Sequence, residues 1–400
     1  MTVEIPIGER VRFYRDARRL SQVVVAGLAG ITPDYLGQIE RGRTPTIGLL
    51  HRLAKILNVP TSVLLGEAAV STDAPVVPAA DQVYRAMLVP RGVHREAGLA
   101  EISVRLHEAW RIWQHEPDRY TQASALLPQL IDEVEGALQR TRAPGEAAGR
   151  RRANQLAADL NFLLRSFCKR AGRVDLSMVA ADRAVRAAQA AEDPTRLAAA
   201  YWNLGHAQLA QGAAEHALEC SLTAIEINAI EAEAGGEPAI ALTGALHLVA
   251  AVAESRLRDG AWKARERLRL QALPAARAVR SPNIAWTAFN EVNVNLHAFN
   301  LELESGESAQ ALQIADGIDG ARYVSMERRL TYLLDMARCH DQRRDDAAVL
   351  LHLLEAEREM PEDLRFNTLA RDLVRGLVKR ARPSLSAQVR RLADRMELFL

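Results

Sequence analysis

The stretch that most constrains the fold of this chain is 21–43, SQVVVAGLAGITPDYLGQIERGR. Ser21 is a favourable N-cap before an apolar run. Gly30 follows where a sharp turn needs a residue without a Cβ atom. Thr32 is a second N-cap, and Pro33 occupies a first helical position, where a missing N–H costs nothing. The pattern therefore predicts two short helices joined by a glycine turn.

The second of these helices, predicted over 33–41, buries Leu36 and Ile39 at i, i+3 spacing. Its exposed residues are predicted to be Asp34, Gly37 and Gln38. Two short helices around such a turn form a helix-turn-helix unit, whose second helix fits the major groove of DNA. Arg41 and Arg43 lie at the end of that helix, where they are placed to contact phosphates.

Three segments within residues 5–66 resemble the Cro/repressor-like (XRE) helix-turn-helix domains. The segments are GERVRFYRDARRLSQ, AGITPDYLGQIERGR and LHRLAKILNVPTSVLLG. The resemblance implies a five-helix, lambda-repressor-like DNA-binding domain over 1–66, with its last short helix from Thr61 to Gly66. Two features depart from the family pattern. Valines stand at 23–25 in place of the usual polar surface, and Gly37 replaces a longer residue on the recognition helix.

The same resemblance implies roles for individual residues. Arg15 and Glu40 match the positions of a buried ion pair, with a phosphate contact as the alternative for Arg15. Gln22 matches a position whose amide and backbone N–H hold a DNA phosphate. The groove-facing positions are matched by Thr32, Pro33, Asp34 and Gln38.

Two of the groove-facing residues have side chains suited to reading bases. Gln38 is suited to paired hydrogen bonds with adenine, and Asp34 to accepting one from cytosine N4. For Asp34, stabilisation of the first helical turn is an equal alternative. One such domain contacts a short half-site, so we expect a homodimer on a palindromic operator with half-sites one turn apart.

Charge and composition agree with this division of the chain. Residues 1–66 carry a net charge of +4 and the remainder −3, so the N-terminal region is the part suited to meeting phosphate. Cys168, Cys220 and Cys339 are too widely spaced for a metal site or a disulfide framework. The longest apolar run, 239–253, is shorter than the ~20 residues of a membrane span. We therefore expect a cytoplasmic protein.

Residues 67–81, EAAVSTDAPVVPAAD, have the composition of a linker, and residues 82–400 read as helices throughout. The clearest unit is 199–225, AAYWNLGHAQLAQGAAEHALECSLTAI. It resembles a tetratricopeptide repeat at Tyr201, Leu204, Gly205, Gly212, Ala217 and Ala224. Further turns are predicted at Gly172, Asp259-Gly260, Gly306 and Arg344-Asp345, and a helix break at Pro383. These spacings predict a right-handed α-superhelix with a concave face.

One helix of this region carries an unusual polar stripe beside an apolar one. The apolar stripe is Phe289, Val292, Leu296, Phe299 and Leu303. The polar stripe is Asn290, Asn293, His297, Asn300 and Glu304. Asparagine is a poor helix former that presents both a donor and an acceptor, which suits a peptide backbone. We expect Asn161, Arg165, Trp202 and His206 to face the same groove, with pairing between helices as the alternative.

The sequence has no phosphate loop, dinucleotide fingerprint, nucleophile elbow or zinc-ligand spacing, so we expect no enzyme activity, no cofactor and no metal. The architecture resembles actinobacterial XRE regulators with helical-repeat bodies, and also the peptide-sensing quorum regulators of Gram-positive bacteria. The hypothesis is a sequence-specific transcriptional regulator. Its helical region would dimerise and sense a peptide, a small molecule or a partner protein. The alternative is an interaction scaffold, whose N-terminal domain serves only for tethering.

Overall fold

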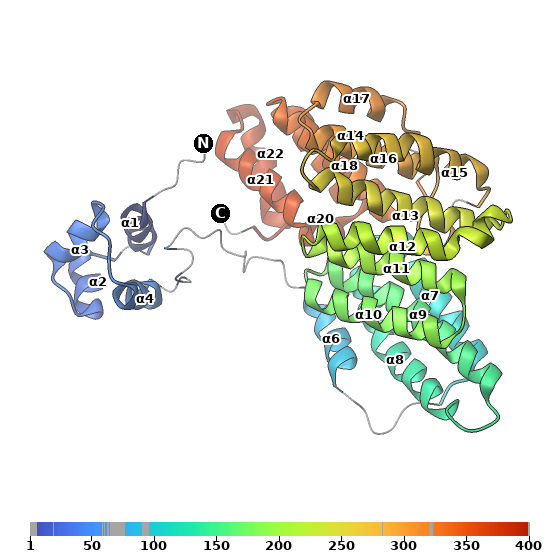
Figure 1. Ribbon diagram of the computed structural model, residues 1–400. Coiled ribbons are helices and arrows are strands. Elements are labelled where there is room, and N and C mark those ends of the chain that lie inside the picture. Colours follow the sequence, from blue (N-terminus) through green and yellow to red (C-terminus); the bar gives the residue numbers. More distant parts are fainter. Residues whose placement is uncertain are drawn as a thin grey trace. The chain divides into compact units, whose positions relative to one another are not determined.

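The computed structural model divides into two compact units, Met1–Ala74 and Pro75–Leu400, which we call the head and the body. Within the described residues every regular element is helical (Figure 1), which confirms the predicted all-α class. The described residues are 6–18, 20–57, 59, 61, 64, 77–89, 96–281, 283–319 and 323–398.

The head has the predicted short helices with the predicted caps. Its helices are α1 (Ile7–Ala17), α2 (Gln22–Ala29), α3 (Pro33–Glu40) and α4 (Ile47–Ile56). The hydroxyl of Ser21 accepts the N–H of Val24 at 3.3 Å, and that of Thr32 accepts the N–H of Tyr35 at 3.2 Å. Gly30 ends α2 at φ 69°, in the left-handed region that favours glycine. The helix-turn-helix unit is therefore built by local side-chain and backbone signals.

A small apolar core holds these helices together. Its fully buried members include Val11, Val25, Leu36, Ile39 and Leu53. Gly8 of α1 lies directly against α3: a Cβ atom there would come within 2.0 Å of the carbonyl oxygen of Ile39. Most of the predicted fifth helix, 61–66, and residues 67–76 of the predicted linker lie outside the described residues.

The body begins earlier than the predicted linker suggests. Val77 and Ala80 are buried in its core, and Asp81 begins a helix. The first elements are η1 (Pro78–Ala80), α6 (Asp81–Leu88), α7 (Leu99–His115), α8 (Arg119–Arg140), α9 (Ala147–Arg170), α10 (Val174–Ala190), α11 (Pro194–Ala210) and α12 (Ala214–Glu233). Next come α13 (Glu237–Arg256), α14 (Ala261–Arg267), the π-helical η2 (Leu268–Ala272), α15 (Leu273–Ala278), η3 (Ile284–Trp286) and α16 (Glu291–Glu304). The last are α17 (Ser308–Asp316), α18 (Met326–Gln342), α19 (Asp346–Glu359), α20 (Pro361–Phe366), α21 (Thr368–Arg380) and α22 (Pro383–Arg395).

Consecutive body helices pack against one another as hairpins, and Figure 1 shows α9 to α13 as a stack of neighbouring rods. The turns fall where the sequence predicts them. Each contains a residue of positive φ, namely Gly172, Gly212, Asp259, Gly306 and Arg344. A Cβ atom on Gly205 would come within 2.9 Å of Val249 Cγ1, which explains why a residue without a side chain stands where α11 meets α13.

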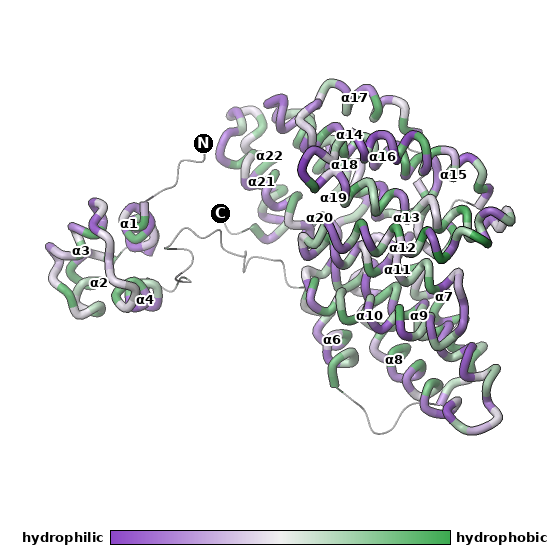
Figure 2. The backbone as a smooth tube through the Cα atoms, in the orientation of Figure 1, coloured by the Kyte–Doolittle hydropathy of each residue, from purple (hydrophilic) through white to green (hydrophobic). Residues whose placement is uncertain are grey.

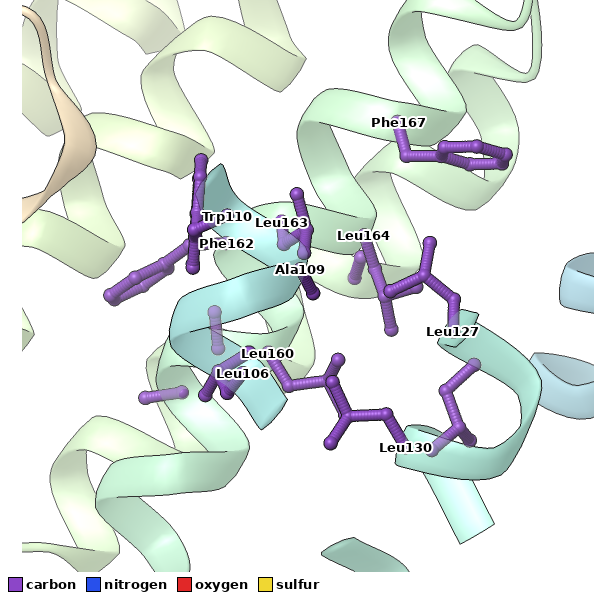
Figure 3. Packing of buried hydrophobic residues seen from close by; sticks show 14 of the residues in the cluster. Leu106, Ala109, Trp110, Leu127, Leu130, Leu160, Phe162, Leu163, Leu164 and Phe167 are labelled. Atoms are coloured by element: carbon purple, nitrogen blue, oxygen red, sulfur yellow. The ribbon is translucent and has the colours of Figure 1, made fainter. Parts of the chain in front are cut away.

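Apolar and polar residues alternate along the body helices (Figure 2), and the apolar ones gather in a core between neighbouring rods. Figure 3 shows Leu106, Ala109 and Trp110 of α7 packed among residues of α9 and α8, with Phe167 further along α9. Trp110 and Trp113 are both buried in this core. The predicted apolar stripe of α16 is likewise buried throughout, which confirms it.

The apolar run 239–253 lies in α13, Glu237–Arg256. This helix is long and apolar enough to cross a membrane, but 72% of its most apolar window is buried inside the body. The α13 helix packs tightly against the loop before α16: a Cβ atom on Gly244 would lie 2.0 Å from a ring carbon of Phe289. In this structure α13 is a core helix.

The end of the body packs back on its beginning. Arg119, which starts α8, forms a fully buried ion pair with Asp363 of α20. The adjacent Glu362 accepts the N–H groups of Tyr120 and Thr121 at the N-terminus of α8. Arg170 of α9 pairs with Glu327 of α18. These contacts join α8 and α9 to α18 and α20 through charged side chains.

Candidate functional site

The outer face of α3 carries the side chains that the sequence assigns to DNA contact. Thr32, Pro33, Asp34 and Gln38 are all exposed, and so are Arg41 and Arg43 just after the helix. The inner face holds Leu36 and Ile39, which are fully buried. The α3 helix therefore presents one polar face from a fixed position in the head.

In the head without DNA, the Gln38 side chain is held in place by Arg43, which lies over Tyr35. The Arg43 guanidinium donates a hydrogen bond to Gln38 Oε1 at 2.5 Å and lies 4.5 Å from the centre of the Tyr35 ring. A cation over an aromatic ring is held electrostatically, which limits the motion of Arg43. The Gln38 amide NH₂ group remains on the exposed face, where a base edge or a phosphate would meet it.

Gly37 does not lie open on this face, in contrast to the prediction. It is buried, because the guanidinium of Arg41 folds back over it. A Cβ atom on Gly37 would lie 3.4 Å from Arg41 Nη1. Because residue 37 has no side chain, the Arg41 guanidinium lies over it, beside the exposed side chain of Gln38.

Arg15 and Glu40 form the ion pair that ties α1 to the end of α3. Arg15 donates to the two Glu40 oxygens at 2.6 and 3.0 Å, and both residues are buried. The hydrogen bond to Glu40 raises the pKa of Arg15, against the opposing effect of burial. Gln22 also donates to Glu40, at 2.7 Å. The Gln22 side-chain amide, predicted to hold a phosphate, is therefore part of this internal network.

The polar stripe of α16 makes contacts within the body. Asn290 is the N-cap of α16, and its side chain accepts the N–H of Asn293 at 2.9 Å. Asn293 in turn accepts a hydrogen bond from Arg328, and Asn300 donates one to Asp335 at 3.0 Å. Both partners belong to α18. Asn293 and Asn300 therefore follow the alternative interpretation, in which they pair between helices, whereas Asn290 caps its own helix.

Asn161 makes a hydrogen bond within its own helix, and His297 is enclosed by the body. The Asn161 amide donates to the carbonyl of Ala157 in its own helix, and the residue lines a separate hollow with Leu138 and Arg183. Burial and the nearby Arg328 lower the pKa of His297 to about 3, so its ring is neutral at pH 7. The predicted common groove for Asn161 and the α16 stripe is not formed.

Three of the residues predicted to bind a ligand do come together. Arg165, Trp202 and His206 line a cavity of about 40 Å³ between α7, α9, α11 and α18, which we call the central cavity. Its other lining residues are Trp110, Trp113, Gln114, Arg119, Ser166, Lys169, Trp286, Thr287, Ala288, Ser325, Glu327 and Arg328. The Arg165 guanidinium donates to Asn203 at 2.7 Å and lies 5.2 Å from the Trp202 ring centre.

The loop that precedes α16 forms one wall of the central cavity. Trp286 stacks on Trp110 with an angle of 2° between the rings and 5.1 Å between their centres. Ala285, Trp286 and Ala288 all have positive φ, a conformation that costs free energy in residues other than glycine. Gln114 fixes this loop by donating to the Trp286 carbonyl and accepting from Asn283.

Lys169 and Arg328 are cavity residues that the sequence analysis did not single out. Burial, together with the charges of Arg170 and Arg165, lowers the pKa of Lys169 to about 7. Although burial alone would raise the pKa of Glu327, Arg170 and Arg328 hold it well below its usual value. Burial and neighbouring cations also lower the pKa of His206 well below its usual value. Positively charged side chains therefore predominate around the central cavity.

A signal for Lys169 was present in the sequence. It lies four residues after Arg165, on the same face of a helix whose other residues in 156–168 are mostly apolar. Arg328 and Glu327 come from a distant helix with no local cue. Among the described residues, no group of three His, Cys, Asp or Glu side chains is placed to hold a metal ion.

Comparison with known proteins concerns mainly the head. The family described as "Helix-turn-helix domain" matches residues 6–65. The immunity repressor protein of Bacillus phage phi105 is 36% identical over 62 residues, which are 15% of this chain and 43% of the repressor. The control protein C.SmaI of Serratia marcescens is 38% identical over 66 residues, 16% of this chain and 79% of that protein.

Among solved structures, Bacillus thuringiensis PlcR, crystallised in complex with the peptide PapR7 and DNA, is similar with a TM-score of 0.30 and 13% identity. The match covers 74% of this chain and 98% of the PlcR chain. The present chain therefore spans less than half of the length of the phage repressor and most of the lengths of the control protein and of PlcR.

Proposed function

We propose that this chain, which belongs through its head to the helix-turn-helix family of the control protein C.SmaI, is a sequence-specific DNA-binding transcriptional regulator. The observation that carries the proposal is the outer face of α3. Gln38, Asp34 and Arg43 stand exposed there on a short helix whose inner face is packed in the head core. A helix of this kind inserts into the major groove and reads base edges with its first turns.

The geometry of the head supports a division of roles on α3. Gln38 is the candidate for reading adenine, because its amide offers one donor and one acceptor side by side once Arg43 releases its oxygen and turns to a phosphate. Arg43 and Arg41 are the candidates for phosphates. Arg15, Glu40 and Gln22 act from inside by fixing the angle between α1 and α3. Asp34 stands at the first turn of α3, where both base contact and helix stabilisation remain open.

The remaining parts of the hypothesis concern the body. One α3 helix reaches only a short half-site, so we propose a homodimer on a palindromic operator. We also propose that the body senses an effector, a peptide, small molecule or partner protein, and that binding changes DNA affinity by thermodynamic linkage. Such a regulator acts in the cytoplasm on double-stranded DNA.

Selection of bound duplexes from a random library by the full-length protein tests the proposal. We expect an enriched motif made of two inverted half-sites, about one helical turn apart between centres. A Gln38→Ala variant should lose preference at one position of each half-site. Enrichment of no motif by the intact, folded protein would contradict the proposed function.

A second function is favoured by one specific observation. The α2 helix exposes apolar side chains: Val23 is 67% and Leu28 65% exposed, and Phe13 of α1 is 64% exposed. Val24, which is also exposed, lies four positions before Leu28 on the same face of α2, and an exposed apolar face of this kind marks a protein contact. In this alternative the head is a tethering module and the body recruits a partner. It predicts stable purification with a partner held by the body, loss of the head's own tethering contact in Val23→Ser/Leu28→Ser, and no DNA selection.

A further inference from the structure

Most buried and half-buried arginines of the body are paired with carboxylates, although, among the described residues, the half-buried Arg152 bonds only to Gln155 and Ser103. Arg119 pairs with Asp363, Arg196 with Asp159, and Arg267 with Glu254. The same holds for Arg329 with Glu355 and Glu359, Arg338 with Glu304 and Asp335, and Arg380 with Asp341 and Asp346. This is expected, because removing an unpaired charge from water is costly.

The central cavity departs from this rule. Among the described residues, neither Arg165 nor Lys169 has a carboxylate within ion-pair distance, and Arg165 has only the Asn203 oxygen and the Trp202 ring as partners. Arg328 contacts Glu327, but Glu327 is shared with Arg170. Four cations therefore surround a single carboxylate, which leaves an excess of positive charge around the hollow.

The lining and the size of the cavity also suit a binding subsite for a small group. It is walled by Trp110, Trp113, Trp202 and Trp286, whose rings fix its dimensions. Ser166, Thr287 and Ser325 also line it. At about 40 Å³ it is much smaller than a typical pocket for a drug-sized ligand, so it has room for one compact polar group.

We propose that the central cavity binds an oxyanion, the carboxylate or phosphate group of an effector, through Arg165, Lys169 and Arg328. A carboxylate and a phosphate both present several acceptor oxygens to cationic donors, and both supply the missing negative charge. A bound oxyanion contacts α9, α18 and the loop before α16 together. It therefore favours the arrangement in which these elements are closed around the cavity.

Binding of the anion and its regulatory consequence are separable claims. That the anion controls DNA affinity rests on the proposed function, whereas its binding to the body does not. An anion titration in the absence of DNA consequently tests the site alone. A failure of DNA selection with intact anion binding would count against the proposed function and leave the site standing.

The tryptophans provide a direct probe, because four of the five in the chain line the cavity. The fifth, Trp262, is exposed, and a Trp262→Phe background removes its signal. We would titrate the full chain with inorganic phosphate, N-acetylglycine, its neutral amide N-acetylglycinamide, and sodium chloride at equal ionic strength. A saturable fluorescence change with phosphate or N-acetylglycine, and none with the amide or chloride, is expected.

The titrations with phosphate and with N-acetylglycine distinguish the two possible sources of the oxyanion. Response to phosphate alone assigns a phosphorylated effector, response to N-acetylglycine alone assigns a carboxylate such as a peptide C-terminus, and response to both leaves the shared oxyanion chemistry. Lys169→Met should weaken binding about tenfold or more, the loss expected for one charge-assisted hydrogen bond. Lys169→Arg keeps the charge and should retain binding. Arg258→Met, at a side chain that is 97% exposed, is the matched control and should bind as the parent does.

Two results would overturn the proposal. One is the lack of a saturable response to either anion by the folded protein. The other is a response that N-acetylglycinamide reproduces, or that Lys169→Met and Arg258→Met leave equally unchanged. If Lys169→Met does not fold, Lys169→Arg and Arg165→Lys decide the question: both keep the positive charge, and loss of binding in both would exclude a site that depends on that charge.

Discussion

Glu40, the last residue of α3, accepts two hydrogen bonds from the guanidinium of Arg15 in α1, at 2.6 and 3.0 Å. The pair lies inside the head and joins the first helix to the recognition helix. This buried electrostatic contact therefore acts together with the apolar core in fixing the position of α3 within the head. Several consequences of this arrangement can be measured.

Removing one member of the pair should destabilise the head. Glu40→Ala removes the buried carboxylate partner of Arg15 and leaves only the exposed Asp16 carboxylate, a change that costs about 3 kcal/mol or more in comparable buried pairs. Faster amide hydrogen exchange in α1 and α3 of the full-length protein would report it. Asp16→Ala is the matched control: Asp16 also contacts Arg15, at 2.6 Å, but its side chain is 56% exposed. The control should cost less than about 1 kcal/mol.

Two glycines of the head should respond to alanine in opposite directions. Gly8→Ala places a Cβ atom 2.0 Å from the backbone oxygen of Ile39, so α1 and α3 must move apart and the head should lose stability. Gly27→Ala, inside α2, meets nothing within 4 Å and should add about 0.5–1 kcal/mol through helix propensity. Circular dichroism during urea unfolding of both full-length variants measures the difference. Equal effects would contradict the described packing of α1 on α3.

Gln38 and Arg43 should differ in how they affect DNA binding. Gln38→Ala should cost about 1–3 kcal/mol on the preferred sequence and little on others. Arg43→Ala should weaken binding to all sequences and reduce the salt slope by about one. Fluorescence anisotropy with a preferred duplex and a scrambled duplex over a salt series separates the two effects. The same profile for both variants would contradict the assigned roles.

The stability of the body should depend on pH through Lys169. Its pKa is about 7 in the folded body and 10.5 in an ordinary setting, so the unfolded chain binds more protons between these values. Stability contributed by this residue therefore rises with pH across that window, and below it the full cost of burying the charge is present. The surrounding charges are Arg165 and Arg170 on α9, with Glu327 and Arg328 on α18.

Lys169→Met removes that cost, so the variant should have a higher Tm than the parent at pH 6, with the difference narrowing towards pH 9. Tryptophan fluorescence of the full chain follows the unfolding of the body. Lys263→Met, at an exposed position beside Trp262, removes no buried charge and is the control. If the difference in Tm between Lys169→Met and the parent stayed constant from pH 6 to pH 9, it would contradict the buried position of the Lys169 ammonium group among other cations.

The head was predictable because its signals are local. Ser21 and Thr32 cap helices through hydrogen bonds to residues three positions away, and Gly30 supplies the left-handed turn by itself. The prediction for Gly37 was wrong because it considered the backbone pattern alone. The cover over Gly37 comes from the flexible side chain of Arg41, whose direction is not fixed by helical spacing.

The body was predictable in its turns and less so in its interior. Gly172, Gly212 and Gly306 mark hairpins because they adopt positive φ. The stripe beginning at Asn290 was assigned by helical period, although asparagine is also a favoured N-cap and α16 begins directly after it. A period shows which residues share a face, but it shows neither where a helix begins nor what packs on that face.

The contacts that close the body could not be predicted from the sequence. Arg119 and Asp363 are 244 positions apart, and Trp110 and Trp286 come from different hairpins. Nothing in the local sequence of either partner specifies the other. The charge excess at Lys169 depends on the same long-range packing, because it is defined by which carboxylates do not reach the cavity.

The central claim is that the head reads DNA. The most direct measurement is anisotropy of a labelled duplex from the promoter region of the gene that encodes this protein, bound by the full chain in competition with random duplex. We predict that the promoter is preferred, and that the logarithm of the binding constant falls linearly with the logarithm of salt concentration. Equal competition by random duplex, or binding that does not change with salt, would contradict it.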